Sequence, residues 1–202
     1  LMRILGRDHS TACTGWGLIR AELIDGQLDY EYIAHGYLEK PKGLNYPDTL
    51  RYMGNSVRDL LAELKPDMVA LEAPKDNRGF KATQALTELV GIIKYILMIA
   101  GYPFKEVPPS VMKKLVTGYG WSTKEEVATK IAELFSIPYE NLVKVETYKT
   151  GEKKGQVRSY KLDGTDALGL ALAFIPYVKS QGGRLDFEYQ RGTKIAGTTG
   201  AS

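Results

Sequence analysis

The stretch KLDGTDALGLALAF, from Lys161 to Phe174, places two aspartates at the start of a long apolar run. Asp163 and Asp166 stand three residues apart, and side chains at that spacing share one face of a helix. Asp163 alone could cap the N-terminus of such a helix, because the free N–H groups there favour a carboxylate. Two carboxylates on one face repel each other, and a divalent cation would remove that cost. The stretch therefore predicts a helix whose first turn carries either a simple cap or part of a metal site.

The first 39 residues contain three stretches that are typical of β-strands. Residues 2–8, 14–23 and 28–39 are rich in β-branched and aromatic side chains, and Asp25-Gly26 between the last two is a strong hairpin signal. We therefore expect three consecutive antiparallel strands at the N-terminus.

Helix and strand patterns alternate after residue 40. Apolar residues at helical spacing predict a helix that Lys65-Pro66 stops, and the apolar run at 68–74 predicts a strand buried on both faces. The remaining expected elements are a helix at 81–100, a strand at 102–108, a short helix at 110–116, and a helix that begins at Ser122 with Glu125 completing a capping box.

This order of elements predicts one α/β domain over residues 1–180. Its mixed sheet should be antiparallel on one side and parallel on the other. A basic insertion interrupts the domain near 143–160 and could form a hairpin. Residues 181–202 are rich in Gly, Thr and Ser, and we expect them to be a flexible C-terminal tail.

The composition is that of an ordinary globular domain, with 202 residues, of which 44% are hydrophobic and 25% charged. The net charge of +3 is too small to indicate nucleic acid by itself. Lysines nevertheless concentrate between Lys105 and Lys161. Such a patch could meet phosphates, and a solvated surface hairpin would have the same composition.

The single cysteine, Cys13, excludes an intramolecular disulfide and suits a reducing compartment, so we expect a cytoplasmic protein. The apolar stretch at 89–102 is short and contains Lys94, which favours a core helix over a membrane span. We therefore expect no membrane partner.

Acids end two of the predicted strands as well as beginning the last helix. If the first and fourth strands are neighbours, Asp8 and Glu72 emerge side by side at one edge of the sheet, where sites in α/β folds gather. The helix that starts with Asp163 and Asp166 could then complete a four-carboxylate pocket. Oxygen-only ligands suit magnesium or manganese, and two such ions would clamp the oxygens of a phosphodiester displacement. The pattern predicts a metal-dependent phosphodiesterase, although a lone acid at a strand end is usually just solvated.

Three blocks of sequence carry a family resemblance. They are ILGRDHSTACTGWGLI at 4–19, VALEAP at 69–74 and DGTDALGLALA at 163–173. In their order and spacing they resemble the RuvC family of Holliday-junction resolvases, within the RNase H-like nuclease superfamily. The resemblance covers about residues 2–178. It implies an RNase H-like five-stranded mixed sheet, with three antiparallel strands followed by parallel ones and with flanking helices.

The resemblance also implies an activity and a set of site residues. Asp8, Glu72, Asp163 and Asp166 would be the catalytic residues and would ligate two Mg²⁺ ions, for which Mn²⁺ can substitute. The enzyme would be a homodimer, joined through the helix after Glu72, that cuts four-way DNA junctions by paired symmetric nicks. The residues expected to contact DNA are Lys75, Phe80, Lys113 and Lys124.

The chain departs from the family pattern at several positions. Arg7 and His9 stand where the family typically has an aliphatic residue and often a proline; His9 is either a proton carrier or a simple turn residue. Lys75 replaces an aromatic residue that follows the catalytic Glu, which leaves Phe80 as the nearest aromatic for base stacking. The basic stretch at 143–160 is longer than in compact members.

Three alternatives stay open at this point. Another RNase H-like nuclease could act on branched or flapped DNA or on an RNA strand. A junction-binding protein could hold DNA without cutting it, although four intact acids argue against that. A sugar-kinase-like ATPase shares the strand order, but the chain is too short for a second, phosphate-binding half.

Overall fold

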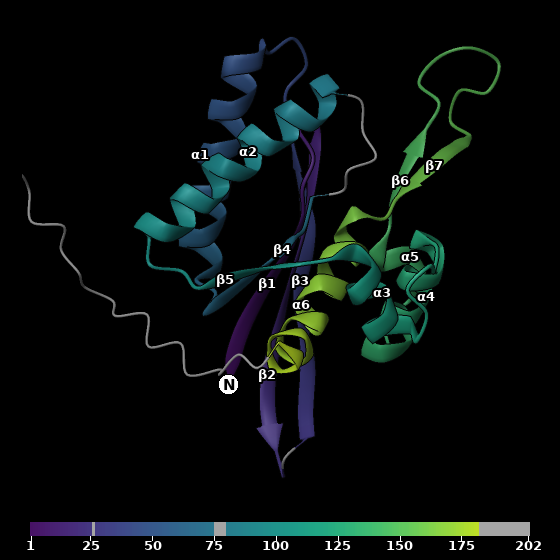
Figure 1. Ribbon diagram of the computed structural model, residues 1–202. Coiled ribbons are helices and arrows are strands. Elements are labelled where there is room, and N and C mark those ends of the chain that lie inside the picture. The colour runs from purple at the N-terminus through teal and green to yellow at the C-terminus, as the bar shows by residue number, and fades with distance from the viewer. Residues whose placement is uncertain (26, 75–79, 182–202) are drawn as a thin grey trace, which may run out of the picture.

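The computed structural model describes residues 1–25, 27–74 and 80–181. Its centre is a five-stranded sheet, seen edge-on in Figure 1. The strands are β1 (Met2–Asp8), β2 (Cys13–Ile24), β3 (Gln27–Glu39), β4 (Met68–Glu72) and β5 (Phe104–Val107). They lie in the order β3-β2-β1-β4-β5.

The pairing of the strands confirms the predicted mixed sheet. β1 pairs with β2 and β2 with β3 in antiparallel fashion, whereas β1–β4 and β4–β5 are parallel. β1, β3, β4 and β5 therefore all run in the same direction. Their carboxyl ends lie at one edge of the sheet, which is the edge where the sequence predicts a site.

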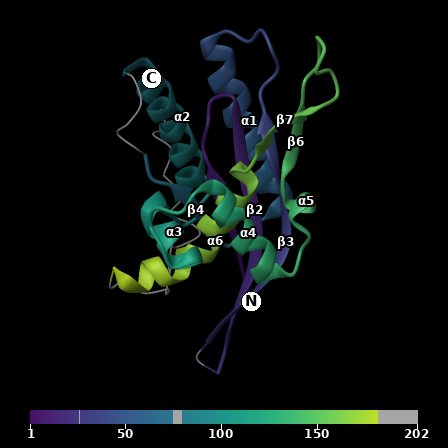
Figure 2. The ribbon, with the colours of Figure 1, turned by 90° about the vertical axis from the view of Figure 1, so that its right-hand side faces the viewer.

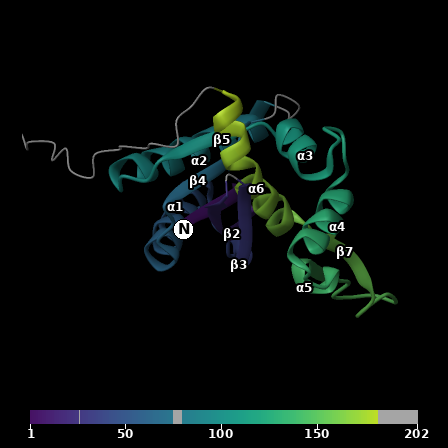
Figure 3. The same cartoon turned by 90° about the horizontal axis from the view of Figure 1, so that it is seen from below.

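Six helices within the described ranges flank the sheet. They are α1 (Tyr46–Leu64), α2 (Phe80–Ile99), α3 (Pro109–Thr117), α4 (Lys124–Phe135), α5 (Tyr139–Leu142) and α6 (Asp163–Ser180). Figure 3 shows α1 and α2 on one face of the sheet and α6, α3 and α4 on the other.

A second, two-stranded sheet is formed by β6 (Lys144–Thr147) and β7 (Val157–Lys161). Residues 144–161, which we call the arm, project away from the body of the molecule (Figure 2). The basic insertion thus forms a hairpin, as its sequence allowed.

Alternating residues of the central strands separate the two layers of the core. In β4, Val69 and Leu71 pack with α1 and α2, whereas Met68 and Ala70 pack with α6. Because both faces of this strand are buried, its sequence is an apolar run instead of a polar–apolar alternation.

One predicted helix start was wrong, and the structure decides whether Asp163 is a helix cap. The capping box of α4 is formed by Thr123 and Glu126, one residue later than expected, because the hydroxyl of Ser122 is bonded to Thr117 and Tyr119 in the preceding connection. At the start of α6, Leu162 holds the cap position without a side-chain bond, so Asp163 does not act as the cap.

Glycines let α6 lie directly against the backbone of β1 and β2. A Cβ atom at Gly6 would lie 1.8 Å from the carbonyl oxygen of Ala167, and one at Gly15 would lie 2.1 Å from that of Asp163. No L side chain fits at these distances unless the helix moves. The sequence thus brings the first turn of α6 to the carboxyl edge of the sheet.

None of the helices in the described ranges has the length and apolar character needed to cross a membrane.

We predict that Gly6→Ala lowers the free energy of unfolding by about 3 kcal/mol or more, because the new methyl group overpacks against helix backbone. The matched control is Gly91→Ala in α2, where an added Cβ has no neighbour within 4 Å. This control should raise stability by about 1 kcal/mol, since alanine favours a helix over glycine. Urea unfolding of both variants checks the prediction; equal stabilities would contradict the close packing of α6.

Candidate active site

The parallel pairing of β1 and β4 brings two acids together. Asp8 is the last residue of β1 and Glu72 the last residue of β4, and the register pairs Arg7 with Leu71 just before them. The two carboxyl groups are close enough to share a hydrogen bond. This arrangement is the one that the strand-end pattern predicts.

One lysine links the acids of the sheet to those of α6. Nζ of Lys124, the first residue of α4, lies 3.2 Å from Oδ2 of Asp8. The same nitrogen lies 2.8 Å from Oδ1 of Asp163 and 2.8 Å from Oδ2 of Asp166. A single ammonium group thus contacts three carboxylates, which come from β1 and from the first turn of α6.

Burial makes the charges of this cluster costly. Burial raises the pKa of Asp8 well above its ordinary value, and the carboxyl of Glu72 raises it further, against the opposing effect of Lys124. The pKa of Asp166 is also raised, again chiefly by burial. Burial disfavours the charge on Lys124, but the carboxylates of Asp8 and Asp166 outweigh it and raise the lysine's pKa. The site is therefore a crowded set of carboxyl groups held together by one cation.

The donor atoms of the acids fit a divalent metal ion. Oδ1 of Asp166 is buried and has no hydrogen-bond partner among the described residues, so it is an acceptor suited to a cation or a donor. All the candidate ligands are oxygens, as magnesium and manganese prefer. Within the described ranges, no three Asp, Glu, His or Cys side chains already form a metal-binding cluster. Lys124 takes the central place among the acids, and a metal ion would have to displace it.

Of the other residues predicted to contact DNA, Lys113 has a described side chain. Nζ of Lys113 donates to the carbonyl oxygen of Ser122, so this lysine secures the connection between α3 and α4. Lys75 lies outside the residues that the structure describes. Phe80 begins α2, but its side chain is likewise outside the described part of the structure. The DNA contacts of these three residues stay predictions.

Arg7 and His9 are buried on the other side of β1 from the acids. Arg7 is 0% exposed, and its guanidinium nitrogens have no hydrogen-bond partner in the part of the chain that the structure describes. Burial lowers the pKa of Arg7 to about 9. Burial, together with Arg7 and Lys94, also lowers the pKa of His9 well below its ordinary value. A buried histidine that stays neutral does not suit a proton carrier, so the structure favours the alternative of a turn residue.

Sequence reasoning missed two exposed aromatic side chains beside the site. Tyr119 and Trp121 lie in the α3–α4 connection and are 62% and 84% exposed. Trp121 lies three residues before Lys124, the lysine that contacts the acids. The sequence did contain a signal for them. Two aromatic residues in a glycine-containing turn do not belong to the core, which points to an exposed functional surface.

Glu39 was also missed. It ends β3, which runs in the same direction as β1, so it lies at the edge that carries Asp8 and Glu72. The strand-end argument applied to Asp8 and Glu72 would have found it. Its carboxylate binds Lys144 and Lys161 at the base of the arm.

A mixed five-stranded sheet with acids at the ends of β1 and β4 and at the start of a helix packed across them defines a nuclease of the RNase H-like class. Solved structures of junction resolvases share this fold. The Thermus thermophilus RuvC structure matches 89% of this chain and 97% of its own, with a TM-score of 0.67 and 19% identity. The yeast mitochondrial Holliday junction resolvase Ydc2 matches 90% of this chain and 80% of its own, with a TM-score of 0.57 and 13% identity.

Sequence comparison identifies the family. The family model described as crossover junction endodeoxyribonuclease RuvC matches residues 4–144. The relative of that name from Syntrophomonas wolfei is 34% identical over 136 residues, which cover 67% of this chain and 77% of the relative. The one from Acidobacterium capsulatum is 31% identical over 140 residues, which cover 68% and 82%. The chain belongs to the RuvC family, as its sequence blocks predict.

We predict that Arg7→Met raises the free energy of unfolding by about 1–4 kcal/mol, because an apolar side chain replaces a buried charge that has no partner in the described structure. Arg20→Met is the matched control: Arg20 forms an exposed ion pair with Glu31, and its loss should change stability by less than about 1 kcal/mol. Thermal and urea unfolding of both variants would check this. A destabilised Arg7→Met protein would contradict it.

Proposed function

We propose that the chain is a metal-dependent endonuclease that resolves four-way DNA junctions by paired, symmetric nicks. The observation that carries this proposal is the convergence of Asp8, Asp163 and Asp166 on the ammonium of Lys124, with Glu72 beside them. Membership of a family described as crossover junction endodeoxyribonuclease supports the choice of substrate. A Thermus thermophilus RuvC structure of the same fold (TM-score 0.66, 17% identity) is a complex with a Holliday junction substrate.

Asp8, Glu72, Asp163 and Asp166 would hold divalent cations, with Mg²⁺ the expected ion and Mn²⁺ a substitute. Such cations, when bound, lower the pKa of water and neutralise charge on a phosphodiester. Asp163 and Asp166 lie beyond the family-matched residues 4–144, so their assignment rests on their position beside Asp8. The buried, unpaired Oδ1 of Asp166 supports its role as a ligand.

Lys124 has two tasks in this proposal. In the free protein its ammonium offsets the repulsion among the acids. If the acids held divalent cations instead, the ammonium would be free to contact a phosphate oxygen of the DNA as a point charge. The side chain of Lys124 is 44% exposed, so it can move away from the acids without disturbing the core. Tyr119 and Trp121, in the same α3–α4 region, are placed to stack on unpaired bases.

A homodimer joined through α2 would give two sites related by a two-fold axis. Tyr95, Met98 and Ile99 near the end of α2 are 60%, 50% and 64% exposed. An apolar surface of this kind supports an interface between copies. Two such sites would act on opposing strands of a junction, whose own symmetry matches that of the dimer.

The proposal also includes the bounds of the nuclease domain and the cellular location of the protein. Residues 1–180 are the nuclease domain, and 181–202 are given no part in the activity. We expect the protein to act in the cytoplasm, in keeping with its single Cys13.

We expect this protein to nick a labelled four-way junction symmetrically in the presence of Mg²⁺ and to leave a linear duplex of the same sequence intact. Asp166→Asn should lower the cleavage rate by at least about 1,000-fold, roughly 4 kcal/mol of lost transition-state stabilisation, because a ligand at the reacting centre is changed. Junction binding in a gel-shift assay should persist. Glu133→Gln, an exposed change on α4, is the control and should cut normally.

The other outcomes of this assay are equally informative. Cutting of flaps, of the linear duplex or of an RNA strand would keep the nuclease and overturn the junction specificity. Firm junction binding without cutting in Mg²⁺ or Mn²⁺ would support a junction-binding protein and overturn the nuclease.

We also predict competition between Lys124 and Mg²⁺ for the acids. Without metal, Lys124→Met should lower the free energy of unfolding by about 1–2 kcal/mol, since the lysine is partly exposed. Added Mg²⁺ should stabilise this variant at about tenfold lower concentration than wild type, equivalent to about 1.4 kcal/mol of removed competition. Differential scanning fluorimetry across a Mg²⁺ titration measures both effects.

Lys130→Met on the same helix is the control for this titration, because its lysine contacts only the exposed Glu133. It should respond to Mg²⁺ like the wild type. A Lys124→Met protein with the wild-type response would mean that the lysine and the metal do not share ligands.

A further inference from the structure

The arm, residues 144–161, projects beyond the body of the molecule. β6 and β7 pair only with each other, and all the side chains from Thr147 to Tyr160 are exposed to solvent. Figure 1 shows the arm rising at the end of the molecule where β1 and β4 finish, which is the end that carries the acids. The family match stops at residue 144, where the arm begins. The arm therefore lies outside the part of the chain that the family model covers.

The arm also holds the positive charge of the protein. It contains six basic and two acidic residues, a net charge of +4. The whole chain carries +3, so the other 184 residues together carry −1. A polyanion such as DNA would be attracted to the arm and not, on balance, to the remainder of the chain.

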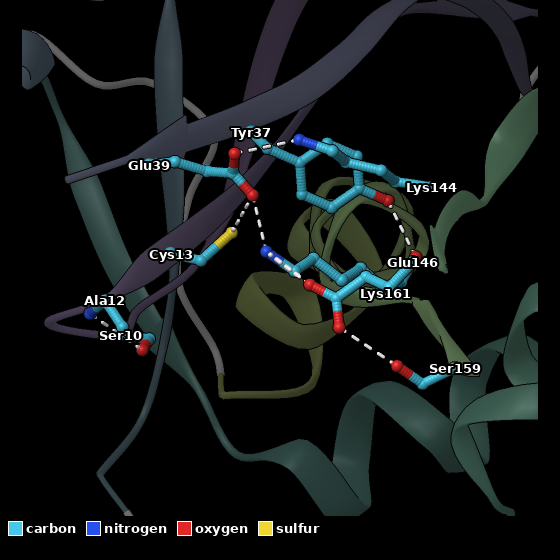
Figure 4. Close-up of polar contacts among 9 residues, drawn as sticks. All are labelled: Ser10, Ala12, Cys13, Tyr37, Glu39, Lys144, Glu146, Ser159 and Lys161. Carbon is cyan, nitrogen blue, oxygen red and sulfur yellow. Dashed lines mark hydrogen bonds and ion pairs between the residues drawn. The ribbon is translucent and has the colours of Figure 1, made fainter. Parts of the chain in front are cut away.

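Ion pairs fix the base of the arm to the sheet. Oε2 of Glu39 lies 2.8 Å from Nζ of Lys144, and Oε1 of the same carboxylate binds Lys161 (Figure 4). Lys161 also pairs with Glu146 at 3.2 Å, and the hydroxyl of Tyr37 donates to the carbonyl oxygen of Lys161 at 2.9 Å. Hydrogen bonds from Lys144 and Lys161 lower the pKa of Glu39 to about 2, so the anchor is ionised at neutral pH.

This anchor holds the arm next to the acids. Lys161 precedes Asp163, the first residue of α6, by two positions. Glu39 lies at the carboxyl edge of the sheet, like Asp8. The direction of the arm is therefore set by the end of β3 and the start of α6, at the same edge of the sheet as the acids.

Four basic residues of the arm are left free by this anchor. Lys149, Lys153, Lys154 and Arg158 form no ion pair within the described residues, in contrast to Lys144 and Lys161. Lys149 and Arg158 line a groove of about 550 Å³ along the arm, to which Lys42 also contributes. An exposed surface with this many unpaired cations is suited to phosphate groups.

We propose that the arm binds the phosphate backbone of a duplex limb of the DNA substrate next to the cleavage site, through Lys149, Lys153, Lys154 and Arg158. This inference rests on the proposed function for the identity of the polyanion. The contacts are to phosphate and carry no sequence information, so the arm adds affinity and orientation but no preference for particular bases. Lys144 and Lys161 keep the arm in place through Glu39 and do not take part in the contact.

The test is a variant in which all four free basic residues are replaced by alanine. Its affinity for a labelled four-way junction is measured in EDTA, where no cutting is expected, over a series of salt concentrations. At 150 mM salt the dissociation constant should rise roughly tenfold or more, and the slope of log affinity against log salt should fall by about 2–4, since each lost phosphate contact contributes about 0.9. At saturating enzyme with Mg²⁺, the cleavage rate should stay within about twofold, because the acids are unchanged.

Two further proteins control for total charge and for folding. Arg20, Arg51, Arg58 and Lys105 are exposed elsewhere on the molecule, and their replacement by alanine removes the same charge. That variant should keep an affinity and a salt slope close to wild type. The triple variant Lys149→Arg, Lys153→Arg and Lys154→Arg keeps the charge of the arm and should keep both values as well.

Unchanged affinity in the four-alanine arm variant would overturn the inference. So would weaker affinity with an unchanged salt slope, because the arm would then act by something other than phosphate contact. An equal loss in the matched-charge control would mean that net charge matters and the arm does not. Cleavage by the wild-type protein is scored separately, so failure of the proposed function and failure of the arm give different results.

Discussion

The closeness of α6 to the backbone of β1 and β2 is the constraint on which the site depends. Gly6 and Gly15 leave no room for a side chain between strand and helix, so the carbonyl oxygens of α6 rest almost on the strands themselves. This contact fixes both the height and the rotation of the helix. Asp163 and Asp166 consequently reach the ammonium group of Lys124, which also contacts Asp8 at the end of β1. A helix held farther out by ordinary side chains would keep the same sequence of acids but would not gather them.

Gathering the acids has an energetic cost that the rest of the site offsets. Buried carboxyl groups that face one another favour the protonated form, and the raised pKa values of Asp8 and Asp166 express this. Lys124 relieves the repulsion in the free protein, and it does so from a partly exposed position at the start of a separate helix. The ammonium of Lys124 is held by contacts that a divalent ion could replace. Strained electrostatics of this kind are expected at a functional site and not in a core selected only for stability.

The sequence predicted the order of elements along the chain and a mixed sheet, because period-two and helical patterns separate well in this chain. The structure supplies the neighbour relation of β1 and β4, which the prediction of the site had assumed. Contacts between distant elements were harder to predict. Lys124 lies far from Asp8 in the sequence, so its place among the acids follows only from how α4 packs. The start of α4 was ambiguous for a local reason: Ser122 with Glu125 and Thr123 with Glu126 fit the same capping pattern, and tertiary bonds of Ser122 decide between them. The complete burial of Arg7 contradicts every expectation for a charged residue, so no pattern would have predicted it.

The positive charge of the arm offsets the repulsion between the acids and the phosphates of DNA. Four carboxyl groups at the carboxyl edge repel the phosphates that a nuclease must bring there, and the body of the chain, at −1 overall, offers no compensating attraction. A bound cation neutralises the acids only at short range, because exposed charges are screened beyond about 10 Å. Attraction of the duplex on either side of the cleavage point therefore has to come from another surface at the same end of the molecule. Glu39 ties the arm to that end with two of its lysines, which leaves the other basic residues unpaired and extended past the acids. The division between anchoring and free cations is what separates the proposed DNA-binding arm from a merely solvated hairpin.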